Sequence, residues 1–163
     1  MSVQISEIGP VAEALEARFP GAVTEWKTDR GQTIAYLEPA SIVDVCRFLK
    51  EEQQFERLAG ITAVDWYPLE PRFEVVYFLH SLRRRQRLRL KCRVSEQEAE
   101  LDSLTGVWRS ANWYEREVFD LFGIRFRGHP NLRRIMLPED WVGHPLRKDY
   151  PVHGFKYSYK DEP

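Results

Sequence analysis

The chain has 163 residues, 43% of them hydrophobic, which suits a single domain with a core of its own. Its 24 Lys and Arg residues nearly balance its 25 Asp and Glu residues, and a net charge of −1 excludes a global field that attracts nucleic acid or anionic membranes. The longest aliphatic and aromatic run, residues 75–79, is far shorter than the ~20 residues that span a bilayer, and residues 1–8 lack a secretory signal pattern. We expect a cytoplasmic protein, soluble or peripheral to a membrane.

The first hundred or so residues predict an alternation of helices and strands. In chain order, the periodicity predicts a helix at 10–19, a strand hairpin at 23–27 and 33–37, an amphipathic helix at 41–49, and strands at 61–67, 73–80 and 87–94. This order predicts an α+β fold: a single domain with a mixed or antiparallel sheet packed by helices. We expect that domain to span residues 1–123 and an extended C-terminal arm to span residues 124–163.

The strand at 87–94 has one apolar face and one strongly basic face. The apolar residues are Leu88, Leu90, Cys92 and Val94, and the basic residues are Arg87, Arg89, Lys91 and Arg93. Arg83, Arg84 and Arg85 extend the basic block into the preceding turn. A basic sheet face is a feature of RNA-binding modules, but this strand carries no aromatic residue for base stacking and acidic residues follow at once. We therefore expect no nucleic-acid partner.

The two cysteines indicate structural roles rather than a redox or metal site. Cys46 and Cys92 lie on apolar faces of predicted elements, and neither belongs to a Cys-x-x-Cys pair, so we expect both to be buried and reduced. His129 and His144, each within Gly-His-Pro, lack the close spacing of known zinc sites. No phosphate-binding glycine loop and no nucleophile elbow is present in the sequence.

A charged helix is predicted to end at Phe122, where Gly123 suits the left-handed residue that follows many helices. Its apolar stripe comprises Tyr114, Val118, Leu121 and Phe122. Arg116 and Asp120 are four residues apart and are expected to pair. Glu115 and Glu117 point about 200° apart on a helix, so they cannot bracket one bond as paired catalytic carboxylates do. Caps and ion pairs are the simpler interpretation of these charges.

The segment after Gly123 is rich in proline and has no helical period. Four of its prolines are Pro130, Pro138, Pro145 and Pro151. Its many large apolar residues have no core of their own, which indicates that the arm lies on a partner. We expect His129 and His144 to bind neighbouring carbonyl or carboxylate groups, and Arg133, Arg134, Arg147 and Lys148 to bind acidic groups of that partner.

Residues 113–151 resemble the C subunit of proton-pumping NADH:quinone oxidoreductase, respiratory complex I, also called the 30-kDa subunit family. The family signature starts with Glu-Arg-Glu, two residues, an acid and two hydrophobic residues, as in Glu115-Arg116-Glu117-Val118-Phe119-Asp120-Leu121-Phe122. It continues to a His or Lys and a basic, hydrophobic stretch, matched by His129 and Arg133-Arg134-Ile135-Met136. The segments Leu137-Pro138-Glu139-Asp140-Trp141 and Gly143-His144-Pro145-Leu146-Arg147-Lys148-Asp149-Tyr150-Pro151 are also similar to the family.

The resemblance implies a structural and assembly subunit without catalytic residues or cofactors of its own, within an enzyme complex that passes electrons from NADH to quinone. NADH, quinone, FMN and iron–sulfur clusters would belong to the parent complex, at the cytoplasmic face of the cell inner membrane. The implied partners are the D subunit, which carries the quinone site, and the B and I subunits; the membrane is contacted only through the complex. The implied interface residues are Glu115, Arg116, Glu117, Asp120, His129, Arg133, Arg134, His144, Arg147, Lys148 and Asp149.

Two alternatives stay open at this point. Related assemblies share this subunit, among them ferredoxin-using and F420-linked quinone-reducing complexes and membrane-bound hydrogenases, and the sequence does not choose among these electron donors. A stand-alone hydrolase using Glu117, Asp120 and His129 is the other alternative, because the three lie close together in the sequence.

Overall fold

The computed structural model describes residues 9–154, and a five-stranded mixed sheet is the centre of the fold. Its strands are β1 (Val23–Asp29), β2 (Gln32–Leu37), β3 (Arg57–Asp65), β4 (Phe73–Ser81) and β5 (Gln86–Val94), in the spatial order β1-β2-β5-β4-β3. β2 pairs with β5 in parallel, and the other neighbours are antiparallel. The predicted α+β fold with a mixed sheet is therefore confirmed.

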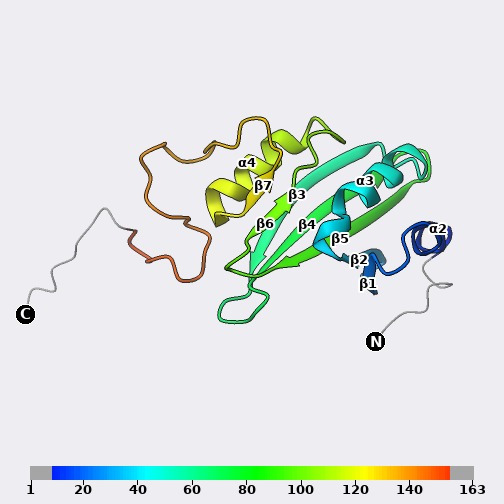
Figure 1. The fold of residues 1–163 in the computed structure, drawn as a ribbon, viewed down its shortest axis with the longest axis horizontal. Helices are drawn as coiled ribbons and strands as arrows, with labels where there is room; N and C mark the ends of the chain where they lie inside the picture. Colours follow the sequence, from blue (N-terminus) through cyan, green and yellow to red (C-terminus); the bar gives the residue numbers. More distant parts are fainter. Residues whose placement is uncertain (1–8, 155–163) are drawn as a thin grey trace, which may run out of the picture.

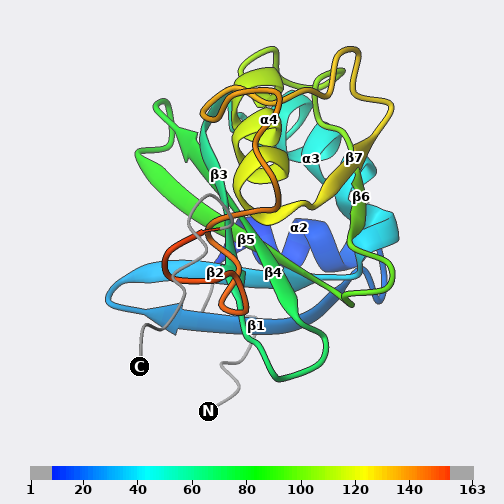
Figure 2. The same ribbon diagram turned by 90° about the vertical axis from the view of Figure 1, so that its left-hand side faces the viewer.

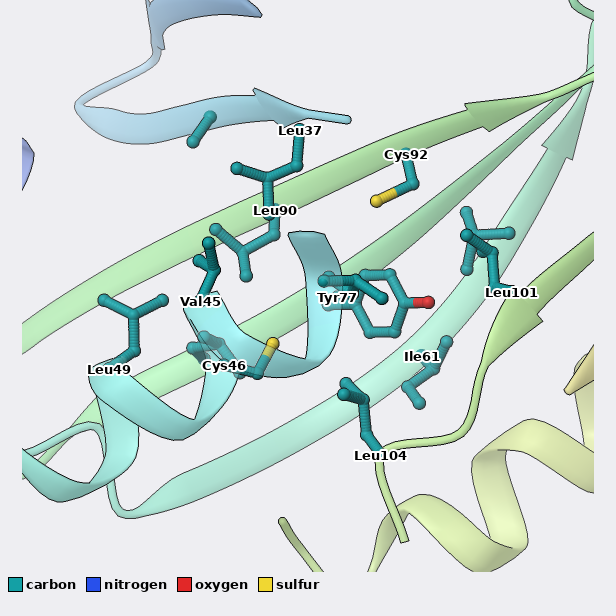
Figure 3. Close-up of a cluster of buried hydrophobic side chains, with 14 of the residues drawn as sticks. Leu37, Val45, Cys46, Leu49, Ile61, Tyr77, Leu90, Cys92, Leu101 and Leu104 are labelled. Carbon is teal, nitrogen blue, oxygen red and sulfur yellow. The ribbon is translucent and has the colours of Figure 1, made fainter. Parts of the chain in front are cut away.

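Three helices lie on one side of this sheet (Figures 1 and 2). They are α2 (Pro10–Arg18), α3 (Ile42–Glu51), which follows the short 3-10 turn η1 (Pro39–Ser41), and α4 (Ala111–Phe122). The apolar stripe of α3 packs over the sheet, where Cys46 and Cys92 face a common cluster with Tyr77 at its middle (Figure 3). Both cysteines are fully buried and unpaired, as expected from the sequence.

A second, two-stranded parallel sheet joins β6 (Glu100–Asp102) to β7 (Arg125–Arg127). The sequence prediction missed it, because each strand has only three residues and the two are paired across more than twenty positions. Ile124 and Phe126 are buried in the main core, so the ordered domain continues past Gly123. Residues 128–154, which follow β7 and contain no helix or strand, are called the arm below; residues 155–163 of the predicted arm lie outside the described residues.

The predicted strand at 61–67 was wrong at both ends, since β3 runs from Arg57 to Asp65. Its early start includes a bulge between Leu58 and Gly60. It ends at Asp65 because that carboxylate accepts the backbone N–H of Tyr67 at 2.9 Å, which turns the chain away from the sheet.

The sheet face away from the helices carries the basic row of β5. Glu74 of β4 is buried beside this row and accepts Lys91 at 2.7 Å and Arg93 at 3.1 Å. Tyr36 lies next to it on β2, under the ammonium of Lys91. The positive charge of the row is thus partly neutralised by Glu74 of the same sheet, which weakens the RNA interpretation further.

Among residues 9–154, no helix has the length and apolar character that crossing a membrane requires.

Candidate functional site

Glu115 of α4 is a buried carboxylate that ties the helix to the loop after β6. Its Oε1 accepts the backbone N–H of Leu104 and its Oε2 accepts the hydroxyl of Ser103, both at 2.6 Å. The side chain is fully buried, and this burial raises the pKa of Glu115 to about 7, against the lowering effect of the two hydrogen bonds. Glu115 thus forms neither the cap nor the ion pair expected from the sequence, because its partners come from another segment.

Arg116 does not form the expected ion pair with Asp120. Its Nε and Nη2 donate instead to the backbone carbonyls of Arg133 and Arg134, each at 3.1 Å. The guanidinium also lies 5.2 Å from the ring centroid of Trp113. Arg116 therefore holds the arm against α4, and the local i, i+4 pair loses to these tertiary acceptors.

Asp120 is the second anchor of the arm and is also fully buried. Its Oδ1 accepts Arg134 at 2.6 Å, and its Oδ2 accepts three successive backbone N–H groups, those of Ile135, Met136 and Leu137, at 2.8–2.9 Å. Burial alone would raise the pKa of Asp120, but these bonds hold the pKa below its ordinary value. The carboxylate is thus a fixed anion around which the arm turns.

The last carbonyls of α4 have no partner within the helix, and the arm supplies their donors. His144 Nδ1 lies 2.9 Å from the carbonyl of Asp120, the N–H of Leu146 donates to Leu121 at 3.0 Å, and Arg147 Nε donates to Phe122 at 2.6 Å. A carbonyl oxygen only accepts, so His144 carries its proton on Nδ1. Burial, together with the nearby Arg147 and Arg134, lowers the pKa of His144, so the ring is neutral.

Gly123 makes this close approach possible. Its φ is +77°, the left-handed conformation predicted for the residue after the helix. A Cβ at this position would lie 2.6 Å from His144 Cδ2 and 2.8 Å from Arg147 Nη2. His129 is the other predicted imidazole anchor, and its Nε2 lies 3.1 Å from the carbonyl of Asn112. The prediction that both histidines bind neighbouring carbonyls is confirmed.

A buried arginine cluster, which the sequence interpretation missed, fixes the far part of the arm. Arg72 is 1% exposed, and its guanidinium binds both oxygens of Asp65 at 2.9 Å, Glu96 at 2.7 Å and Asp149 of the arm at 2.5 Å. Asp65 also accepts the N–H of Lys148 at 2.8 Å. Burial opposes ionisation of Asp65, but Arg72 and the backbone donors lower the pKa of Asp65 to about 2.

The cluster escaped prediction because its members are far apart in the sequence. Arg72 and Asp149 are separated by 77 positions, so no local spacing reveals the pair. The available signal was weaker: Arg72 precedes a strongly apolar strand that starts at Phe73, where an unpaired charge would be costly.

The predicted interface residues therefore fall into two groups. Glu115, Arg116, Asp120, His129, Arg134, His144, Arg147 and Asp149 bind other parts of this chain through their side chains, whereas Glu117, Arg133 and Lys148 are exposed residues. Glu115 binds the loop after β6, and the other members of the first group build and hold the arm. The second group, with the apolar residues beside it, is available for contact with another molecule.

Exposed apolar side chains collect on α4 and the arm. Trp113 is 60% exposed, Met136 62%, Val142 63%, Leu146 51% and Val152 97%. We call these five residues the apolar surface of the arm. Because the arm is bound to α4 and to the sheet at several separate points, these side chains are held on a fixed framework, and large apolar groups left exposed in this way indicate an interaction site. Figure 1 shows the arm at the end of the molecule opposite α2.

The geometry does not bring a hydrolytic centre together. The carboxylate of Asp120 accepts hydrogen bonds from Arg134 and from three backbone N–H groups. The ring of His129 is hydrogen-bonded to the carbonyl of Asn112 and accepts the N–H of Asn131, and Glu117 is exposed. Within residues 9–154, no group of three or more His, Cys, Asp or Glu side chains is placed to hold a metal ion. The arrangement is suited to holding a backbone in place, not to activating a nucleophile.

Known proteins similar to this chain agree on one family. A family model described as "Respiratory-chain NADH dehydrogenase, 30 Kd subunit" matches residues 35–156. The C subunit of NADH-quinone oxidoreductase from Geotalea uraniireducens (strain Rf4) is 49% identical over 140 residues, covering 86% of this chain and 85% of that protein. The corresponding protein of Roseiflexus sp. (strain RS-1) is 50% identical over 144 residues, covering 87% of this chain and 83% of that protein.

Two solved structures share the fold. A trypsin-resistant fragment of Nqo5 superposes with a TM-score of 0.65 at 33% identity, covering 76% of this chain and all of that one. A chain of a membrane-bound sulfane sulfur reductase, an archaeal respiratory membrane complex, superposes with a TM-score of 0.75 at 29% identity, covering 90% of this chain and 85% of that one. Both superpositions show that the fold is shared with chains of known structure.

Proposed function

Because the chain belongs to the family of the 30 Kd subunit of respiratory-chain NADH dehydrogenase, we propose that it is a structural subunit of an NADH:quinone oxidoreductase, without catalytic residues of its own. The chain would present the apolar surface of the arm to neighbouring subunits. The observation that carries the proposal is the combination of exposed apolar side chains with an arm fixed from beneath by Asp120 and Arg72.

The arm is suited to docking because its conformation is set before a partner binds. Asp120 orients residues 134–137, the carbonyls at the end of α4 orient residues 144–147, and Arg72 binds Asp149. A surface that is already ordered loses little conformational entropy on association. Exposed Glu117, Arg133 and Lys148 lie in the same segments as the apolar residues and can form the polar rim that such interfaces have.

The proposed partners are the D subunit, which carries the quinone site, and the B and I subunits. The chain would then lie at the cytoplasmic face of the inner membrane and contact the membrane only through the complex. FMN, iron–sulfur clusters, NADH and quinone would be held by other subunits. In support of this, both cysteines are buried in the apolar core, where burial raises the pKa of Cys92 to about 12 and disfavours the thiolate that binds metals.

The electron donor of the complex is a separate question, and one observation favours a second candidate. A chain from a membrane-bound sulfane sulfur reductase has the same fold over 90% of this chain. This fold therefore also serves in a respiratory complex named for a different reaction. Ferredoxin- or F420-dependent complexes and membrane-bound hydrogenases are the equivalent proposals, and the subunits that copurify with this chain would distinguish them.

Docking through the arm can be tested by affinity purification of the tagged chain from solubilised membranes. We expect Met136→Glu/Leu146→Glu to lower the recovery of the quinone-site subunit about tenfold, since two charges would be buried in the interface. Leu82→Glu is the matched control, because Leu82 is 65% exposed but lies in the turn between β4 and β5. Unchanged recovery in the double variant would overturn the proposal, as would a parent chain that purifies as a monomer with no partner.

A further inference from the structure

A cleft of about 610 Å³ lies at the α2 end of the molecule, between the turns that join β1 to β2 and β4 to β5. Arg30 of the first turn and Arg85 and Arg87 of the second line its rim. None of the residues that line it is acidic. Figure 1 places α2 and the arm at opposite ends of the molecule, so the cleft is distinct from the apolar surface of the arm.

The three guanidinium groups have no hydrogen-bond or ion-pair partner among residues 9–154, and all three residues are exposed. This sets them apart from Arg72 and Arg134, which are bound by carboxylates of the chain itself. Like charges gathered at one place repel one another unless an anion lies between them. Arg30 and Arg85 also occupy the left-handed region, at φ values of 48° and 52°, which is uncommon for such long side chains.

The floor of the cleft decides which kind of anion fits. Val11, Trp26, Phe55 and Leu88 line it, but each is already buried by the core and is at most 9% exposed. An acyl chain or a hydrophobic cofactor would find little apolar surface there. A polar chain that carries carboxylates suits the rim better, because guanidinium groups bind carboxylates through paired hydrogen bonds.

We propose that this cleft binds an acidic segment of a partner polypeptide, with at least two carboxylates placed between the two arginine-bearing turns. The inference rests on the chain working as a subunit of a complex, and it adds a second contact at the end opposite the arm. The subunit then bridges two neighbours, one held by apolar contact and one held by charge.

The test uses the assembled complex with p-benzoylphenylalanine in place of Gln86, an exposed residue that lines the cleft. Recovery of the quinone-site subunit before irradiation tests the proposed function separately. After irradiation, we expect an adduct with a partner segment that contains at least two Asp or Glu residues. A lipid or small-molecule adduct, a segment without acidic residues, or no adduct in the recovered complex would overturn the proposal.

Two matched double variants test the role of charge. Arg85→Gln/Arg87→Gln and Arg83→Gln/Arg84→Gln each remove two positive charges from the same exposed part of the chain, but only the first pair lines the cleft. We expect the first pair to lower the adduct yield about tenfold, which corresponds to about 1.4 kcal/mol, and the second to leave it unchanged. An equal loss in both would show that only the general charge of the turn matters and would contradict a specific site.

Discussion

Replacing Glu115 by Gln should make the chain more stable at alkaline pH, which is unusual for the loss of a hydrogen-bonded carboxylate. The side chain is fully buried, and its pKa is raised to about 7. In the unfolded chain a Glu has a pKa of about 4.3, so the folded state binds the proton more tightly. The stabilisation by this group is therefore complete below pH ~4.3 and is lost as the pH rises through about 7.

The size of the effect follows from the difference between the two pKa values. One pKa unit corresponds to about 1.4 kcal/mol, so the parent chain loses about 3 kcal/mol from this group between pH ~4 and pH ~8.5. In Glu115→Gln the amide oxygen can still accept the N–H of Leu104, and the amide nitrogen can donate to the Ser103 hydroxyl oxygen. The variant stays neutral, and its stability should not show this loss.

Urea unfolding of the purified chain, followed by tryptophan fluorescence at several pH values, measures the difference directly. We expect nearly equal free energies of unfolding at pH ~4 and an advantage of about 3 kcal/mol for Glu115→Gln at pH ~8.5. Glu117→Gln is the control, because Glu117 is exposed on the same helix, and its curve should follow that of the parent. Parent and Glu115→Gln curves that stay parallel across this range would refute the reasoning, since Glu115 would then be a stably held anion.

Three further variants test how the arm is held. Arg72→Met should lower the free energy of unfolding by about 3–5 kcal/mol, because it leaves buried Asp65 without its cation, and it should speed tryptic cleavage at Lys148; unchanged cleavage would contradict the anchor. Gly123→Ala should cost at least about 1–2 kcal/mol in thermal unfolding, because φ is +77° and the new Cβ meets His144; an unchanged midpoint would show that the arm does not press on this residue. Asp120→Asn should cost about 2–3 kcal/mol and speed hydrogen exchange of the arm amides that bind it, while protection equal to that of the parent would argue against it.

The sequence predicted those parts of the fold that are encoded by nearby residues. The apolar stripe of α3, the alternation of β5 and the glycine after α4 each appear within one short window, and each is found in the structure. The parallel pairings of β2 with β5 and of β6 with β7 join distant segments, and no window contains both partners. Such pairings depend on how the whole chain packs, so local patterns did not predict them.

The site shows the same division between local and distant partners. The motif around α4 identified the family and most of the side chains that matter, but their roles depended on segments elsewhere. Arg116 and Asp120 have the spacing of an ion pair, yet each finds better partners in the arm. The histidines were interpreted correctly because the following proline restricts the backbone, the preceding glycine leaves room for a close approach, and carbonyls are the acceptors available near a helix end.

The central claim, that the arm presents a docking surface to another subunit, can be tested by hydroxyl-radical footprinting of Met136. This residue is one of two methionines in the chain and is 62% exposed in the structure of the chain alone. The account predicts that oxidation of Met136 is rapid in the isolated chain and falls at least about fivefold in the purified complex. Equal oxidation of Met136 in both preparations would contradict it.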